Sequence, residues 1–201
     1  ETVRDFMTNA QVRRDYWARD ARPMSAEALR EAWRDTRVVL ASPRGDIPER
    51  VTGPLGEQRL TGPAHLAALA ALGDHQPRAV RDLEADTGLE LGVLADALFQ
   101  LAAFGCLSIA QDDATIARCK PRTERLNARL VALAATSDDI TVLASPVTGG
   151  GVDVGWVEQL FIAAIGTGCR TPGEWAAHAQ KHAKSWNEAE LAARARSFAG
   201  R

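Results

Sequence analysis

Two histidines and a glutamate near the C-terminal end are spaced as metal ligands could be. Glu174, His178 and His182 follow one another at intervals of four residues, which would place them on one side of a helix. Carboxylate and imidazole groups so arranged can bind zinc. The pattern departs from the H-E-x-x-H motif because Ala179 stands where the general base would be. No cysteine or acid at a recognisable distance completes the set. A solvated helix face is therefore the preferred interpretation, and we assign no metal ligand and no catalytic residue.

A glycine-rich run forms the second candidate site, because backbone amides of such loops can hold a phosphate. The run is Thr148, Gly149, Gly150 and Gly151, and it follows an expected strand over residues 140–143. It lacks the Gly-Lys-Ser/Thr ending of a P-loop and the G-x-G-x-x-G of a dinucleotide fold. Asp153 would place a carboxylate near the following helix start, where an anion would bind. The run is better interpreted as a connector or a contact loop.

The N-terminal segment mixes aromatic and basic side chains, as protein interfaces do. Arg13, Arg14, Tyr16 and Trp17 make up this candidate contact surface. The alternative is that Tyr16 packs in the core while the arginines are solvated. The residue types alone favour neither interpretation.

The clearest run of elements lies between residues 63 and 112. Pro63 and Pro77 each open an expected helix, and a third helix is expected from about residue 90 to 104. A short strand at 106–109 and a turn follow, which is the layout of a winged helix. Such a fold raises DNA binding as an alternative function. Residues 89–104 contain no Lys or Arg, and only Gln100 could read a base, so contact with protein is favoured.

The remaining elements suggest a second module. A long helix is expected from Pro121, followed by the strand at 140–143, an apolar helix over 154–165 and a helix from Thr171 to about Lys184. Asn187 and Glu190 would cap a last helix. Residues 38–43 resemble 141–146, so the module could repeat the first. We expect a first domain over 1–118, with the winged-helix-like block at 63–112. A C-terminal helical module is expected over 119–201, and its similarity to the first module raises a second winged-helix-like unit as an alternative.

Composition limits the class of protein. The 201 residues are 46% hydrophobic, 25% charged and 5% aromatic, and the net charge is −2. These values predict a mainly helical α+β protein with short strands, rich in the helix formers Ala and Leu. The small negative charge argues against a nucleic-acid-coating protein. No apolar run is long enough to cross a membrane, and three scattered cysteines form no disulfide framework. We therefore expect a cytoplasmic protein with reduced thiols.

The sequence resembles a known family in several places. Residues 4–13 read RDFMTNAQVR, which is similar to the opening of the predicted methyltransferase regulatory domain of bacteria, with Val12 where an aromatic residue is usual. Residues 125–130, 143–151 and 158–161 resemble the C-terminal part of the same long methyltransferases. The likeness extends over nearly the whole chain.

The resemblance implies a regulatory or substrate-positioning region of an S-adenosylmethionine-dependent methyltransferase, related to bacterial protein-lysine methyltransferases. The implied catalytic domain lies upstream, so S-adenosylmethionine is expected in the parent protein and no cofactor in this region. The implied partners are that domain and possibly a protein substrate. The opening at Glu1 without a methionine fits a piece of a longer protein. Relatives have a longer polar connection between Lys184 and Asn187.

Overall fold

The computed structural model describes residues 22–53 and 56–200. The chain divides into two compact units between Ala110 and Gln111. Each unit has its own hydrophobic core, and the two cores share no residue. We therefore describe each unit by itself.

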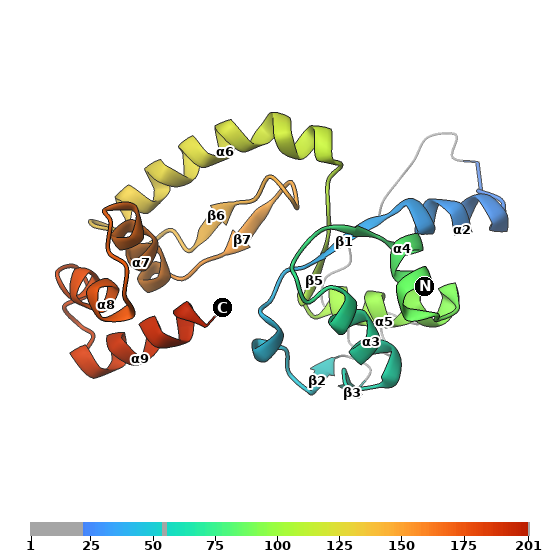
Figure 1. Ribbon diagram of the computed structural model, residues 1–201, viewed down its shortest axis with the longest axis horizontal. Coiled ribbons are helices and arrows are strands. Elements are labelled where there is room, and N and C mark those ends of the chain that lie inside the picture. The colour runs from blue at the N-terminus through green and yellow to red at the C-terminus, as the bar shows by residue number, and fades with distance from the viewer. Residues whose placement is uncertain (1–21, 54–55, 201) are drawn as a thin grey trace, which may run out of the picture. The chain divides into compact units, whose positions relative to one another are not determined.

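In its described residues, the first unit combines a small antiparallel sheet and a hairpin with α-helices (Figure 1). The elements are α2 (Ala26–Asp35), β1 (Arg37–Leu40), β2 (Arg50–Gly53), β3 (Gly56–Arg59), α3 (Pro63–Ala71), β4 (Arg78–Ala79), α4 (Val80–Thr87), α5 (Leu91–Ala103) and β5 (Leu107–Ile109). The strand order is β4-β1-β5, with Val39 opposite Ser108 and Arg37 opposite Ala79. A separate hairpin, β2-β3, follows β1.

Local signals explain the three helices of the winged-helix-like block. Pro63 occupies the first turn of α3, where a missing N–H costs nothing. Gly88 ends α4 at φ +67°, a backbone conformation that favours glycine. Leucines of α5 then form one buried stripe against α3 and β1. The predicted order of three helices and a strand is confirmed, although Pro77 precedes β4 rather than opening α4.

The second unit is a long helix, a hairpin and three packed helices. The elements are α6 (Asp113–Leu133), β6 (Val142–Ala144), β7 (Gly151–Asp153), α7 (Trp156–Gly166), α8 (Pro172–Gln180) and α9 (Glu188–Ala199). Thr171 and Asn187 both form capping boxes, at the starts of α8 and α9. Phe161, Leu160 and Leu191 are the large members of a core otherwise rich in alanine.

Three expectations about this unit were wrong in detail. The domain boundary expected at 118/119 falls inside α6, because Asp112 caps that helix and starts it at Asp113. Pro121, expected to open the helix, lies within it. Gly151, expected to end a loop, instead begins β7, which pairs with β6.

The idea of a second winged-helix-like unit receives limited support. Helices α7, α8 and α9 pack together after a hairpin, as the proposed repeat requires. In the first unit, however, strand β5 follows the third helix and joins β1. Within the described residues no strand follows α9.

The overall class is mainly α with short strands, as predicted. No described helix is both long and apolar enough to span a bilayer.

Candidate functional site

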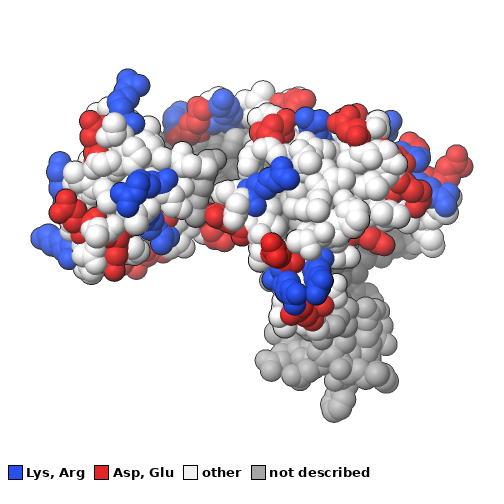
Figure 2. All heavy atoms as spheres, turned by 60° about the horizontal axis from the view of Figure 1, so that its bottom comes forward, with Lys and Arg blue, Asp and Glu red and all other residues white. Residues whose placement is uncertain are grey.

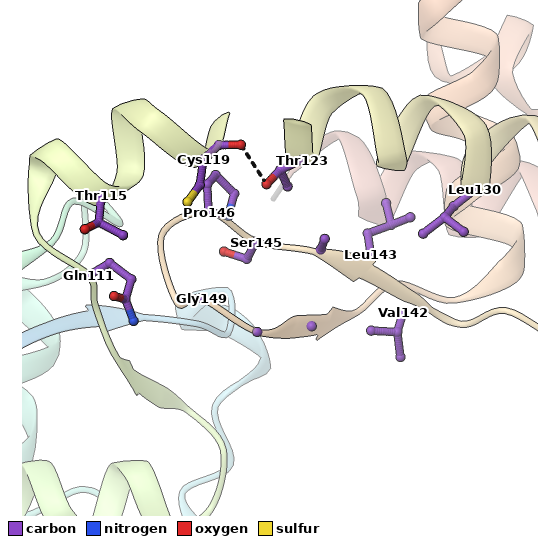
Figure 3. Close-up of a pocket in the computed structure, with 13 residues that line it drawn as sticks. Gln111, Thr115, Cys119, Thr123, Leu130, Val142, Leu143, Ser145, Pro146 and Gly149 are labelled. Atoms are coloured by element: carbon purple, nitrogen blue, oxygen red, sulfur yellow. Dashed lines mark hydrogen bonds between the residues drawn. The ribbon is translucent and has the colours of Figure 1, made fainter. Parts of the chain in front are cut away.

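The three glycines of the glycine-rich run, Gly149 to Gly151, line a cleft of about 620 Å³ between α6 and the β6-β7 hairpin. We call it the glycine-loop cleft (Figure 3). Helix α6 contributes Thr115, Cys119 and Thr123 to one wall, and the hairpin and its turn contribute the other. Gln111, just before α6, lies at the end of the cleft next to Gly149.

Asn127 fixes the hairpin to α6. Its Nδ2 donates to the carbonyl oxygen of Ala144 over 2.8 Å, and its Oδ1 accepts from the N–H of Ala144 over 2.8 Å. The side-chain amide thus pairs with the strand as a neighbouring strand would, and satisfies both backbone groups of that residue. Asn127 gave no sign of this role in the sequence, because its partner lies 17 residues away.

The loop satisfies its own backbone amides. The N–H of Thr148 donates to Oγ of Ser145 over 3.2 Å, and the N–H of Gly149 donates to the Ser145 carbonyl over 3.0 Å. The N–H of Gly150 donates to Oγ1 of Thr148 over 3.4 Å. A phosphate-binding loop needs amides that point at the ligand. These three are engaged within the turn, which supports the contact-loop interpretation over a phosphate site.

Apart from one thiol, the glycine-loop cleft lacks groups for acid–base chemistry. The side chains that line it among the described residues are hydroxyls, an amide, apolar groups and the Cys119 thiol, with no carboxylate, imidazole or basic group. Two hydroxyls are already used as donors, because Thr115 donates to Asp112 over 2.8 Å and Thr123 donates to the Cys119 carbonyl over 3.1 Å. The cleft can accept a contacting side chain, and among its described lining residues the Cys119 thiol is the group of a type that can act as a general acid or base.

The conformation of the glycine-rich loop is expected to depend on Gly149. Its φ is +71°, and an added Cβ would lie 2.7 Å from Nε2 of Gln111. The substitution Gly149→Ala should lower the free energy of unfolding of the second unit by about 1–2 kcal/mol, the cost of left-handed backbone for an L residue. Urea denaturation would measure it.

Gly150 provides the matched control for this prediction. A Cβ there would meet nothing within 4 Å, and its φ lies outside the left-handed region. Gly150→Ala should leave the unfolding free energy within about 0.5 kcal/mol of the unaltered chain. Equal effects at the two positions would show that the loop is not held in the described conformation.

The structure brings His178 and His182 together, with ring centres 5.7 Å apart, but does not complete the possible metal triad in the described residues. Helix α8 ends at Gln180, so His182 lies beyond it, and its Nδ1 donates to the Ala135 carbonyl over 3.1 Å. The Glu174 carboxylate accepts from the N–H groups of Arg170 and Thr171, which lower its pKa. Burial lowers the pKa of His178, and the charges of Lys181 and His182 add to this. In the described part of the chain, no three ligand-type residues are close enough to hold a metal ion.

The third helix of the winged-helix-like block offers no basic surface. Helix α5 contains no Lys or Arg over Leu91–Ala103. Gln100, the possible base-reading residue, accepts at its Oε1 from Nε2 of the buried His65 over 3.1 Å. On the face seen in Figure 2, basic and acidic side chains are interspersed and no basic stripe is seen. The helix surface is suited to protein contact rather than to phosphates.

Sequence reasoning missed an ion pair in the second unit whose carboxylate is buried. Arg194 of α9 donates through Nε to Oε1 of Glu158 on α7 over 2.6 Å, and its guanidinium lies 5.5 Å from the Trp186 ring centre. The Glu158 side chain is only 8% exposed. The pair joins two helices and lines a separate shallow cavity. Arg13, Arg14, Tyr16 and Trp17, the candidate contact surface, lie outside the described residues.

Comparison with curated sequences gives a relative of this chain. An uncharacterized protein of Synechocystis sp. (strain ATCC 27184 / PCC 6803 / Kazusa) is 29% identical over 167 residues. The aligned region covers 82% of this chain, and the chain spans about a third of the length of that relative (33%). No family model matches the chain. No solved structure matches it either.

Proposed function

We propose that this chain is a regulatory or substrate-positioning region of an S-adenosylmethionine-dependent methyltransferase, with the catalytic domain upstream of it. The class of the parent enzyme rests on the resemblance of residues 4–13 and 143–151 to the methyltransferase regulatory family. The regulatory or substrate-positioning role rests on the composition of helix α5. A winged-helix layout whose third helix carries no cation is suited to docking on protein.

The cavities favour a non-catalytic role. Among its described lining residues the glycine-loop cleft contains no carboxylate, imidazole or basic group, and its loop amides are engaged within the turn. The Synechocystis relative is about three times as long as the aligned region, so most of that protein lies outside the similarity. A region of this kind would act by docking on the catalytic domain and shaping the mouth of its cleft. A claim of allostery would also require a measured coupling free energy between two sites.

The chain alone is expected to bind no S-adenosylmethionine. Isothermal titration of the cofactor into the purified 201-residue chain should give only heats of dilution, because the sequence contains no G-x-G-x-G loop after a strand as cofactor-binding domains do. The whole protein, with its upstream region, should bind the cofactor and serves as the positive control. Micromolar binding of S-adenosylmethionine by the 201 residues alone would overturn the proposal that the cofactor site lies upstream.

A winged-helix regulator that binds DNA is the alternative, and the order of elements over residues 63–112 favours it. Binding of that kind depends on phosphate contacts and weakens steeply as salt rises. A gel-shift series on random-sequence duplex DNA should show no retardation even at low salt if the methyltransferase proposal holds. Retardation that disappears with added salt would favour the regulator instead.

A further inference from the structure

Two histidine rings lie side by side at the end of α8. The ring centres of His178 and His182 are 5.7 Å apart, and the ring planes are tilted by 45°. His178 lies on the last turn of α8, whereas His182 lies in the turn after it, where its backbone N–H donates to the Ala179 carbonyl over 3.0 Å. The chain thus continues to wind for one tight turn after α8 ends, which keeps the two rings together.

The hydrogen bond of His182 determines which of its ring nitrogens has a lone pair. Nδ1 lies 3.1 Å from the carbonyl oxygen of Ala135, just after α6. A carbonyl oxygen can only accept, so Nδ1 carries the proton and Nε2 of the neutral ring carries the lone pair. Histidines that bind metal ions are usually held in this way, with the second ring nitrogen donating to a backbone carbonyl or a carboxylate. The ring of His182 is therefore arranged as a metal ligand would be, with Nε2 as the binding atom.

His178 can supply a second imidazole nitrogen. Neither of its ring nitrogens forms a hydrogen bond within the part of the chain that the structure describes. Burial lowers its pKa, and the charges of Lys181 and His182 add to this effect. A histidine must be neutral to bind a metal ion, and the lowered pKa favours the neutral ring at pH 7. Both rings can therefore offer a lone pair at neutral pH.

The separation of the two rings suits a shared metal ion. Imidazole nitrogens bind zinc at about 2.0–2.1 Å, which places the ring centres of two histidines on one tetrahedral ion about 5 Å apart. The observed 5.7 Å between His178 and His182 differs from this by less than about 1 Å. The ring of His182 is held by Ala135, whereas the ring of His178 has no hydrogen bond among the described residues. A rotation of the His178 side chain can therefore close the difference.

We propose that His178 and His182 form a two-histidine site for a divalent transition-metal ion such as Ni²⁺ or Zn²⁺, with water in the remaining positions. Imidazole ligands suit these ions, whereas Mg²⁺ prefers oxygen ligands. Glu174 takes no part, because its carboxylate already accepts from the N–H groups of Arg170 and Thr171. A bound ion would fix the end of α8 to the turn after α6. The inference goes beyond the proposed function and does not depend on it.

Isothermal titration of Ni²⁺ into the untagged 201-residue chain tests the proposal, with Mg²⁺ as the negative probe. Both His178→Ala and His182→Asn should weaken Ni²⁺ binding at least about tenfold. The asparagine side chain of His182→Asn can still donate to the Ala135 carbonyl, so this variant removes the Nε2 ligand and keeps the structural hydrogen bond.

His75→Asn is the matched control for these variants. His75 also bonds through Nδ1 to a backbone carbonyl, that of Leu40 over 3.0 Å, but no second histidine ring lies beside it in the described residues. His75→Asn should therefore change the Ni²⁺ affinity less than about twofold, because a single imidazole binds the ion weakly. An equal loss of affinity in His75→Asn and His182→Asn would overturn the proposal.

A measurement on the unaltered chain keeps the test decisive if a variant unfolds. Added Zn²⁺ should shift the NMR signals of the His178 and His182 ring protons, while those of His65 and His75, the other two histidines of the chain, should stay in place. Zinc shifts confined to the neighbours of the three cysteines would overturn the proposal, because the thiols would then be the ligands. A Ni²⁺ dissociation constant weaker than about 1 mM, or equal binding of Mg²⁺, would also overturn it.

Discussion

Phe161→Ala is expected to lower the free energy of unfolding of the second unit by about 3–5 kcal/mol, the usual range for a buried phenylalanine. Phe161 is fully buried, and its ring centre lies 5.7 Å from that of Phe198. The buried core residues of α8 and α9 are alanines apart from Leu191, and Trp175 and Phe198 pack against this core. Alanine side chains cannot rotate to fill a cavity, so the space left by the ring should persist. The variant should therefore lose the full free energy of unfolding that such a cavity costs.

The effect should be confined to the second unit. Its core contains no residue of the first unit's core. Urea denaturation, monitored by hydrogen exchange of the protected amides in α5 and in α7, would report the unfolding of the two units separately. Ile165→Ala, on the same helix but 44% exposed, is the control and should cost much less than Phe161→Ala. Equal destabilisation of α5 by Phe161→Ala would show that the chain unfolds as one cooperative domain.

The parts of the fold that follow from local chemistry were predictable. Pro63 in the first turn of α3, Gly88 after α4 and the capping boxes of Thr171 and Asn187 each act within a few residues of the chain. The helices they bound were therefore placed close to their observed limits. The absence of cations in α5 was equally visible, because it is a property of composition and needs no geometry.

The parts that depend on distant partners were not predictable. Gly151 to Asp153 has no strand pattern of its own, and it becomes β7 because β6 lies opposite and Asn127 holds the hairpin to α6. The start of α6 was misplaced because Pro121 is the more familiar signal, whereas the Asp112 cap decides it. The spacing of His178 and His182 suggested one helix face, but α8 ends between them.

The candidate site, too, was predictable from the sequence only in its local features. The glycine run was found from sequence, because glycine is distinctive there, and its contact role was preferred over phosphate binding. The hydrogen bonds that support this preference join Ser145 to Thr148 and Gly149 and could be seen only in the folded loop. The Glu158–Arg194 pair, 36 residues apart, carries no local signature at all.

Arg194→Met is expected to destabilise the second unit by about 3 kcal/mol, because it leaves the buried Glu158 carboxylate without its partner. Glu158→Gln should cost clearly less, since the arginine that it leaves behind is 46% exposed and keeps access to water. Arg194 also keeps its contact with the Trp186 ring in that variant. The two single variants should differ because the Glu158 carboxylate is buried and the Arg194 guanidinium is exposed, and not because of the strength of the ion pair.

The double variant separates the cost of an orphaned charge from the value of the pair. Glu158→Gln/Arg194→Met removes both charges, so its free energy of unfolding should recover most of what Arg194→Met loses. Urea denaturation at neutral pH of the two single variants and the double variant completes the cycle. If Glu158→Gln costs as much as Arg194→Met, and the double variant recovers nothing, then packing of the two side chains rather than burial of the carboxylate joins α7 to α9.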